Sequence, residues 1–152
     1  MERVGILCYG ATELGVLSQS PPRRITTGRF VERGVSGGIT LLGTLAALAG
    51  GLWIGGISAL FTTGRWIFFS LGIVPLAGLL GALFDSWLGA TMQAIYHCPV
   101  CDKETERFPR HVCGSETVRI RGWRWLNNDW VNFACSALGA GIGVGLGLLL
   151  GL

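Results

Sequence analysis

The chain has 152 residues, of which 50% are hydrophobic and only 14% are charged, and its mean hydropathy is +0.53. Soluble domains carry about a quarter charged residues, so this composition argues against a water-soluble enzyme and predicts an integral membrane protein. The net charge of +3 is modest, and acidic residues interrupt the basic ones, which argues against nucleic-acid binding.

The first segment, residues 1–34, combines a short apolar stretch with a basic loop. The stretch from Val4 to Ser18 is shorter than the roughly 20 residues of a membrane-spanning helix. Its Glu13 argues against a cleaved signal peptide. The loop that follows is expected in the cytoplasm and contains four arginines, which are Arg23, Arg24, Arg29 and Arg33.

A glycine-rich segment connects this loop to the first long apolar run. Backbone N–H groups at the start of a helix attract anions, and neighbouring arginines neutralise them. The sequence therefore predicts a phosphate-binding loop, and an alternative interpretation is a basic patch that contacts anionic lipid head groups. The expected phosphate-binding residues are Arg23, Arg24, Arg29, Gly37 and Gly38.

Three long apolar runs predict transmembrane helices at 35–61, 66–96 and 130–152. Each is long enough to cross a hydrocarbon core of about 30 Å, and none shows the alternation of barrel strands. The expected fold is an all-α, polytopic transmembrane helix bundle. Glycines recur every four residues from Gly139 to Gly151 and favour close helix packing. Three spans bury little surface, so we expect a homo-oligomer or a partner chain that supplies further helices.

The placement of charge predicts the orientation of the bundle. Two apolar runs separate the basic segment 19–34 from the basic segment 85–129, so both segments should lie on the same side. The positive-inside rule assigns that side to the cytoplasm, and it places the link 62–65 and the C-terminus outside.

Three acidic residues, Glu13, Asp85 and Asp129, should then meet at one membrane face. A carboxylate near hydrocarbon is costly and needs a cation or a proton. Carboxylate and amide oxygens suit Mg²⁺ with bound phosphates, so we expect the three acids to be catalytic. Helix capping is the alternative role for the asparagines. The expected substrate-binding side chains beside the acids are Ser86, Asn128 and Asn132.

A cysteine cluster occupies residues 97–116, before an expected amphipathic polar segment at 117–129. A Cys-x-x-Cys pair followed by His-x-Cys-Gly resembles part of a zinc ribbon, and zinc takes four such ligands in a tetrahedron. We therefore expect a small cytoplasmic hairpin held by structural Zn²⁺; a redox-active or disulfide pair and a metal-free loop are the alternatives. The expected ligands are Cys98, Cys101, His111 and Cys113.

Several short motifs, in this order, resemble one integral membrane family, which includes transmembrane protein 19 and plant phytyl-phosphate kinase. The resemblance runs from about Ala11 to Gly143 and implies a polytopic bundle that corresponds to the C-terminal half of a member. For the plant member it implies phosphate transfer from a nucleoside triphosphate to an isoprenoid monophosphate. The motifs are Glu13-Leu14-Gly15, Thr26 to Gly28, Gly34 to Thr40, Asp85-Ser86 with Leu88 to Gln93, and Asn128, Asp129 and Asn132.

The resemblance leads to the hypothesis of a CTP-dependent polyprenyl-phosphate kinase with catalytic Mg²⁺, acting on a nucleotide and an isoprenoid phosphate at the lipid bilayer. One alternative is a non-catalytic fragment or assembly partner of a larger bundle, because family members have more spans upstream and a second acid where this chain has Cys8. Another is an ion-coupled transporter, although transporter sites usually lie at the membrane midplane.

Overall fold

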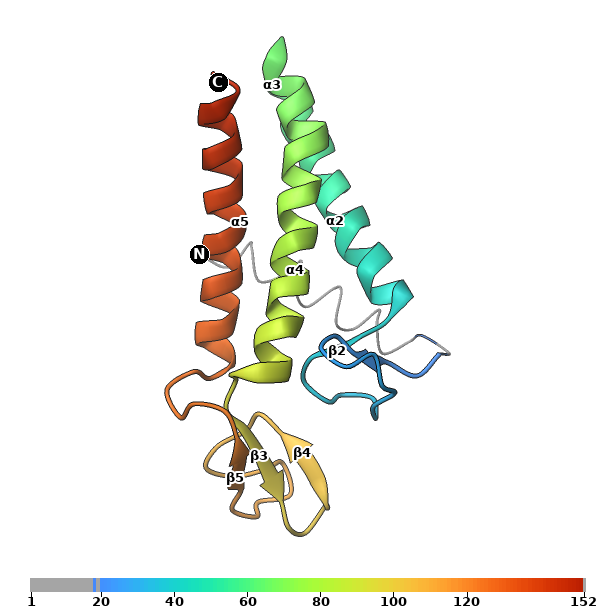
Figure 1. The fold of residues 1–152 in the computed structure, drawn as a ribbon, viewed down its shortest axis with the longest axis vertical. Coiled ribbons are helices and arrows are strands. Elements are labelled where there is room, and N and C mark those ends of the chain that lie inside the picture. The colour runs from blue at the N-terminus through green and yellow to red at the C-terminus, as the bar shows by residue number, and fades with distance from the viewer. Residues whose placement is uncertain (1–17, 19, 152) are drawn as a thin grey trace.

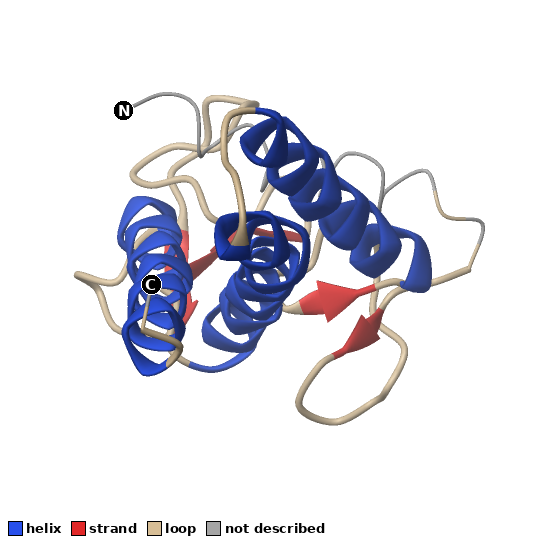
Figure 2. Ribbon diagram, turned by 90° about the horizontal axis from the view of Figure 1, so that it is seen from above, coloured by secondary structure: helices blue, strands red, loops and turns tan. Residues whose placement is uncertain are grey.

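A computed structural model describes residue 18 and residues 20–151, and it is dominated by long helices (Figure 1). Helix α4 packs between α2 and α5, as the view along the bundle also shows (Figure 2). A short helix α3 and a π-helical turn η1 run directly into α4. The bounds are α2 Leu41–Leu60, α3 Arg65–Phe68, η1 Phe69–Ile73, α4 Val74–Thr91 and α5 Asn128–Leu149.

Three helical segments in the described part of the chain are long and apolar enough to cross a membrane. They are Leu41–Leu60, Arg65–Thr91 and Asn128–Leu149, with mean hydropathies of 1.6, 2.3 and 1.6. The predicted helical bundle is therefore confirmed in its main feature. Only 11%, 22% and 17% of these segments is buried, so most of their surface is left to face lipid or other helices.

The expected all-α class is corrected by the structure, which also contains short strands. Strands β1 (Arg23–Arg24) and β2 (Gly38–Ile39) form one antiparallel pair. A second antiparallel sheet has the order β4-β3-β5, with Tyr96 opposite both Thr105 and Arg119. Its strands are β3 Ile95–Cys98, β4 Lys103–Thr105 and β5 Val118–Arg121.

These strands shorten the predicted helices at their polar ends. Helix α2 begins at Leu41 rather than near residue 35, because Thr40 is extended and its Oγ1 accepts a hydrogen bond from Gly43 N at 3.0 Å. Such a side-chain cap satisfies a backbone N–H that has no helical partner. Helix α4 ends at Thr91 rather than at residue 96, and strand β3 follows it. Asn127 caps α5 in the same way, with Oδ1 3.1 Å from Trp130 N.

Helix α2 approaches the π-helical turn closely because two of its glycines lack side chains. A Cβ at Gly55 would overlap the Ser70 carbonyl oxygen, and one at Gly51 would lie 2.8 Å from Pro75 Cα. The Ser58 and Ser70 hydroxyls are 3.0 Å apart across this contact. Pro75 has no backbone N–H to donate, and the π-helical turn Phe69–Ile73 ends two residues before it. The two glycines therefore set the α2–α4 spacing.

The polar segments gather at one end of the bundle, where β1 to β5 lie, and the C-terminus lies at the other end (Figure 1). A buried cluster of Leu88, Leu126, Val131 and Cys135 joins α4 to α5 towards the polar end. At the far end, Arg65 Nη2 donates to the Leu150 carbonyl oxygen. The two basic segments thus lie at the same end of the bundle, as predicted from the two apolar runs between them. The assignment of that end to the cytoplasm is a prediction from charge.

Candidate functional site

Two of the three predicted acids lie at the polar end of the bundle, and Glu13 lies outside the described residues. Asp85 is on α4 and faces α5, where Cys135 Sγ is 3.6 Å from Asp85 Oδ1. Asp129 is exposed in the first turn of α5. A third carboxylate, Glu106, acts electrostatically on Asp85. Glu106 directly follows β4, and no sequence motif distinguishes it.

A hydrogen-bonded group connects the glycine-rich segment, the end of α4 and the cysteine hairpin. Ser36 Oγ is 2.6 Å from Glu106 Oε1 and 3.0 Å from Gln93 Oε1. Gln93 is only 2% exposed, and a buried amide of this kind needs a partner. The Ser36 hydroxyl therefore joins residues that are 57 and 70 positions away in the sequence.

Arg121, on β5, holds the same three segments together. Its Nη1 donates to the carbonyl oxygens of Gly89 and Ala90, at 2.9 and 3.1 Å, and its Nη2 donates to that of Ser36 at 3.4 Å. The carbonyls at the end of a helix have no helical partners and attract cations. Burial lowers the pKa of the Arg121 guanidinium, and Glu104, 3.7 Å away, opposes that shift.

The glycines predicted to bind phosphate have structural roles in the segment before α2. Gly37 has a φ of +83°, and a Cβ there would lie 2.5 Å from Ala90 atoms, so the segment contacts α4 directly. The N–H of Gly38 donates to the Val35 carbonyl oxygen at 3.2 Å. The N–H of Gly38 is therefore engaged within its own loop, and phosphate binding by these glycines stays a prediction.

The three predicted phosphate-binding arginines are dispersed. Arg23 lies over the Phe30 ring, 4.2 Å from its centre, and donates to Gly28 O at 3.3 Å. Arg29 is exposed in the loop. Arg24 acts electrostatically on Arg121, which associates one of the three arginines with the Ser36 group.

A polar cleft of about 290 Å³ lies between the cysteine hairpin and the start of α5. It brings the predicted residues Asn128 and Asp129 together with two arginines that the motifs did not indicate. Among the residues that the structure describes, neither arginine side chain has a salt-bridge partner. The lining residues are Glu106, Arg107, Phe108, Arg110, Asn127, Asn128 and Asp129.

Aromatic contacts fix the hairpin side of this cleft. Phe108 stacks on Tyr96 with ring centres 5.0 Å apart, and the Arg124 guanidinium lies 6.0 Å from the Phe108 ring centre. Tyr96 is buried in the central strand of the sheet. The loop that carries Arg107 and Arg110 is therefore attached to the sheet next to the start of α5.

Two other predicted substrate-binding residues lie outside this lining. The Ser86 hydroxyl donates to Ala82 O at 3.3 Å, within α4. Asn132 is half-buried one turn after Asn128 on α5. Asn127, which the sequence pattern did not single out, both caps α5 and lines the cleft.

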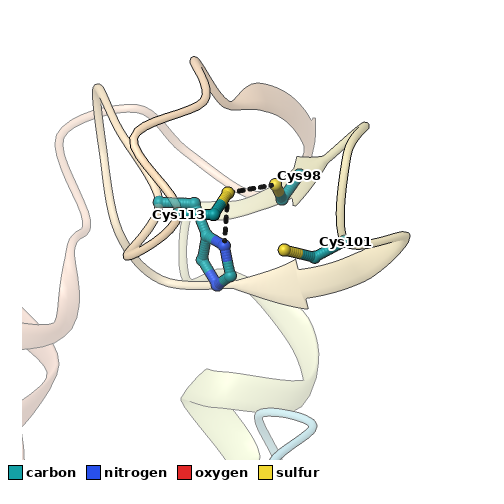
Figure 3. A group of neighbouring side chains, drawn as sticks. Cys98, Cys101 and Cys113 are labelled. Atoms are coloured by element: carbon teal, nitrogen blue, oxygen red, sulfur yellow. Dashed lines mark hydrogen bonds between the residues drawn. The ribbon is translucent and has the colours of Figure 1, made fainter.

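The predicted metal ligands converge at the far side of the hairpin (Figure 3). The ligand atoms of Cys98, Cys101, His111 and Cys113 all lie within 4.8 Å of one another. Cys113 Sγ is 3.5 Å from Cys98 Sγ and 3.3 Å from His111 Nδ1. The three cysteines are free thiols. Burial raises the pKa of the Cys98 thiol, but hydrogen bonding by the Cys101 and Val100 backbone and by the Cys113 and Cys101 thiols outweighs it and brings that pKa to about 7.

Comparisons with known proteins agree with a membrane protein. A family model described as integral membrane protein DUF92 matches residues 10–140. The chain is 41% identical over 138 residues to Protein PGR from Arabidopsis thaliana. This match covers 83% of the chain and 46% of that protein. It is 42% identical over 86 residues to the uncharacterized membrane protein MJ0933 from Methanocaldococcus jannaschii. This second match covers 55% of the chain and 34% of that protein.

The chain thus spans less than half the length of these two relatives. No solved structure matches it.

Proposed function

The chain belongs to the DUF92 family of integral membrane proteins, and we propose that it forms the phosphate-binding end of a Mg²⁺-dependent isoprenoid-monophosphate kinase. One observation carries the proposal: two arginines that have no salt-bridge partner among the described residues share a cleft with Asn128 and Asp129. That combination offers cations for phosphate oxygens and oxygen ligands for a metal.

The chemistry of the cleft residues supports this assignment. Guanidinium groups bind phosphate oxygens through paired N–H donors. Mg²⁺ is usually held by one or two carboxylates together with substrate phosphates. In the proposal Arg107 and Arg110 bind phosphate, and Asp129 with Asn128 holds Mg²⁺. A cleft of about 290 Å³ is at the lower end of small-molecule sites, so it suits the phosphates rather than a whole nucleotide.

Asp85 and Glu106 extend the polar site towards the membrane-spanning helices. Glu106 lines the cleft and also acts electrostatically on Asp85. Like charges that act on each other disfavour the doubly ionised state, so a bound cation would stabilise both carboxylates. Asp85 is not among the residues that line the cleft; in the proposal it contributes to the same cation site as Asp129, and we retain Glu13 as a proposed third acid that lies outside the described residues.

The reaction is a transfer between two phosphates. An oxygen of the lipid monophosphate attacks the terminal phosphorus of the nucleoside triphosphate, a new P–O bond forms, and the bond to the nucleoside diphosphate breaks. The products are a lipid diphosphate and a nucleoside diphosphate, in the proposed case CDP. Phosphoryl transfer depends mainly on positioning and charge neutralisation. The arginines are proposed to do both, and Mg²⁺ would neutralise further phosphate charge.

The apolar helices provide a route for the lipid tail. Exposed apolar side chains cover α2, α4 and α5, and Trp123, Trp125 and Trp130 are exposed beside the polar end. Tryptophan is enriched at membrane interfaces. A prenyl chain in the bilayer would therefore present its phosphate at the level of the cleft.

Segments beyond this chain are a further part of the proposal, because the chain spans less than half of its relatives. Additional helices, from the same protein or a partner chain, would cover the exposed helix faces and supply contacts to the nucleotide base. An assembly role without catalysis is the second candidate, and the same low burial of the three helices favours it.

The test is nucleotide-dependent phosphorylation of phytyl and geranylgeranyl monophosphate in vesicles that contain the chain. Asp129→Asn and Arg110→Ala should each reduce kcat/KM by at least about tenfold, in line with the loss of one charged contact of about 1.5–3 kcal/mol. Arg119→Ala is the matched control, because its exposed side chain contacts only the Gly122 carbonyl oxygen among the described residues. Wild-type turnover in both cleft variants, or neither turnover nor Mg²⁺-dependent nucleotide binding by the inserted protein, would contradict the proposal.

A further inference from the structure

We propose that Cys98, Cys101, His111 and Cys113 bind one structural zinc ion, and that this ion holds the hairpin in the shape that brings Glu106 to Ser36. The inference depends only on the geometry of residues 95–121 and does not require the kinase assignment.

The donor spacing suits a tetrahedral zinc site. Zinc–sulfur bonds of about 2.3 Å and zinc–nitrogen bonds of about 2.0–2.1 Å give tetrahedral edges of about 3.8 Å between sulfurs and about 3.6 Å between nitrogen and sulfur. The observed separations are 3.5 Å for Cys98 to Cys113 and 3.3 Å for His111 to Cys113. All four donors lie within 4.8 Å of one another, so small side-chain rotations bring them to bonding distance of one ion.

Two tight turns present the donors in pairs. In the first, Asp102 N donates to Cys98 O at 2.9 Å, and Asp102 has a φ of +51°. In the second turn, Gly114 N donates to His111 O at 2.9 Å, with a φ of +83° at Gly114.

The structure also distinguishes the two histidines. His97 Nε2 is 3.0 Å from Asp102 Oδ1, and His97 is not part of the four-residue cluster. His111 offers Nδ1 to the cysteine cluster. Four protein ligands complete a tetrahedral zinc site and leave no position for substrate, so the site is structural rather than catalytic.

The hairpin needs such a support because it has little core of its own. Val100, Val112 and Val118 are 73%, 72% and 62% exposed, whereas Cys98 is fully buried. Small domains with insufficient apolar burial commonly use a metal, and metal binding then contributes directly to folding. The buried part of this region therefore centres on the metal ligands and on strand β3.

Metal binding would act on the neighbouring polar group through chain connectivity. Glu106 lies between strand β4 and the second cysteine turn, and its carboxylate meets Ser36 Oγ at 2.6 Å. Glu104, on β4, pairs with Arg121 at 3.7 Å. Loss of the ion would free the segment from residue 99 to residue 116 and withdraw both contacts from the end of α4.

The first experiment measures zinc per chain by elemental analysis of detergent-purified protein. Wild type should contain one zinc ion, and Cys98→Ser and Cys113→Ser should each lose most of it. Two matched controls, Cys135→Ser and His97→Ala, should keep it. Cobalt exchanged into wild type should give a thiolate charge-transfer band that Cys113→Ser lacks. Zinc-free wild type, or equal zinc in Cys98→Ser and Cys135→Ser, would overturn the site.

The second experiment tests the positioning role in the complete, membrane-inserted chain. A chelator should increase tryptic cleavage after Lys103, Arg107 and Arg110 in wild type, and added zinc should reverse the increase. Cys135→Ser should behave as wild type, because its metal ligands are intact. Removal of zinc without any increase in cleavage would leave the metal site standing but would refute its role in holding Glu106.

Discussion

Several single residues have roles that depend on partners distant in the sequence. Arg121 is one of many basic residues between 103 and 124, and nothing in its neighbours distinguishes it. In the structure it donates to carbonyl oxygens of Gly89, Ala90 and Ser36 and pairs with Glu104. These contacts join α4, the glycine-rich segment and the β3-containing sheet. A half-buried arginine with so many acceptors stabilises the polar end more than an exposed salt bridge would.

Replacement of Arg121 should destabilise the protein. We expect Arg121→Ala to lower the free energy of unfolding by about 2 kcal/mol, because hydrogen bonds that involve a charged group contribute roughly 1.5–3 kcal/mol. Arg121→Lys should recover part of the loss, since lysine keeps the charge but not the planar set of donors. Thermal unfolding in one detergent gives the comparison. Exposed Arg119→Ala should change stability by no more than about 0.5 kcal/mol, and an equal loss in both variants would refute the role of Arg121.

The sequence predicted part of the candidate site at this scale. It identified Asn128 and Asp129 because a carboxylate near hydrocarbon is costly and because amide and carboxylate oxygens suit Mg²⁺ with bound phosphates. It did not identify Arg107, Arg110 or Glu106, because their significance arises from contacts across the fold; Ser36 and Glu106 are 70 positions apart. The roles predicted for Gly37 and Gly38 overlooked backbone packing against α4 and within the loop.

Among the elements, the contact between α2 and the α3–η1–α4 helix depends on one face of α2. Gly51 and Gly55 lie one turn apart on this face and meet Pro75 and the Ser70 carbonyl. Gly56 is adjacent to Gly55 in the sequence, but a Cβ there would have no heavy atom within 4 Å. Close helix packing in membranes depends on small residues at the contact, so the two neighbouring glycines should respond differently to substitution.

Gly55→Leu should disrupt the α2–α4 contact, whereas Gly56→Leu should be tolerated. A large side chain at Gly55 must displace the Ser70 backbone, and overpacking of this kind costs about 1–3 kcal/mol. The measurement is the midpoint of thermal aggregation of the detergent-purified variants. Both substitutions add the same side chain, so the difference between them isolates the packing effect. Equal midpoints would mean that α2 does not pack on this face in solution.

Element boundaries were predicted less well than the elements. The apolar runs identified the helices because run length is a strong signal in membrane proteins. The ends of the runs were misleading: residues 38–39 and 95–98 are apolar enough to extend a helix but form strands β2 and β3. Short strands depend on their partners more than on intrinsic propensity. Here strand β2 pairs with β1, and strand β3 pairs with both β4 and β5.

At the scale of the whole molecule, the bundle has one polar end and one nearly uncharged end. The polar end carries both basic segments, and the described part of the other end carries Arg65. The family resemblance and the membrane assignment are confirmed by the family model and the relatives. The orientation across the membrane is a separate inference from charge, since lysine and arginine near the ends of spans are retained in the cytoplasm.

The orientation can be tested with a cysteine at the nearly uncharged end. A membrane-impermeant maleimide applied to intact cells should label Thr63→Cys, which lies in the exposed link before α3. Wild type should remain unlabelled even after a chelator has removed the proposed zinc, because its exposed Cys113 would face the cytoplasm with the hairpin. Labelling of denatured protein from permeabilised cells should detect cysteines in both. If wild type is labelled and Thr63→Cys gives no more label than wild type, the orientation of the bundle is the opposite of the predicted one. The arginine-lined cleft would then lie outside, away from cytoplasmic nucleotides, and the kinase proposal would lose its basis.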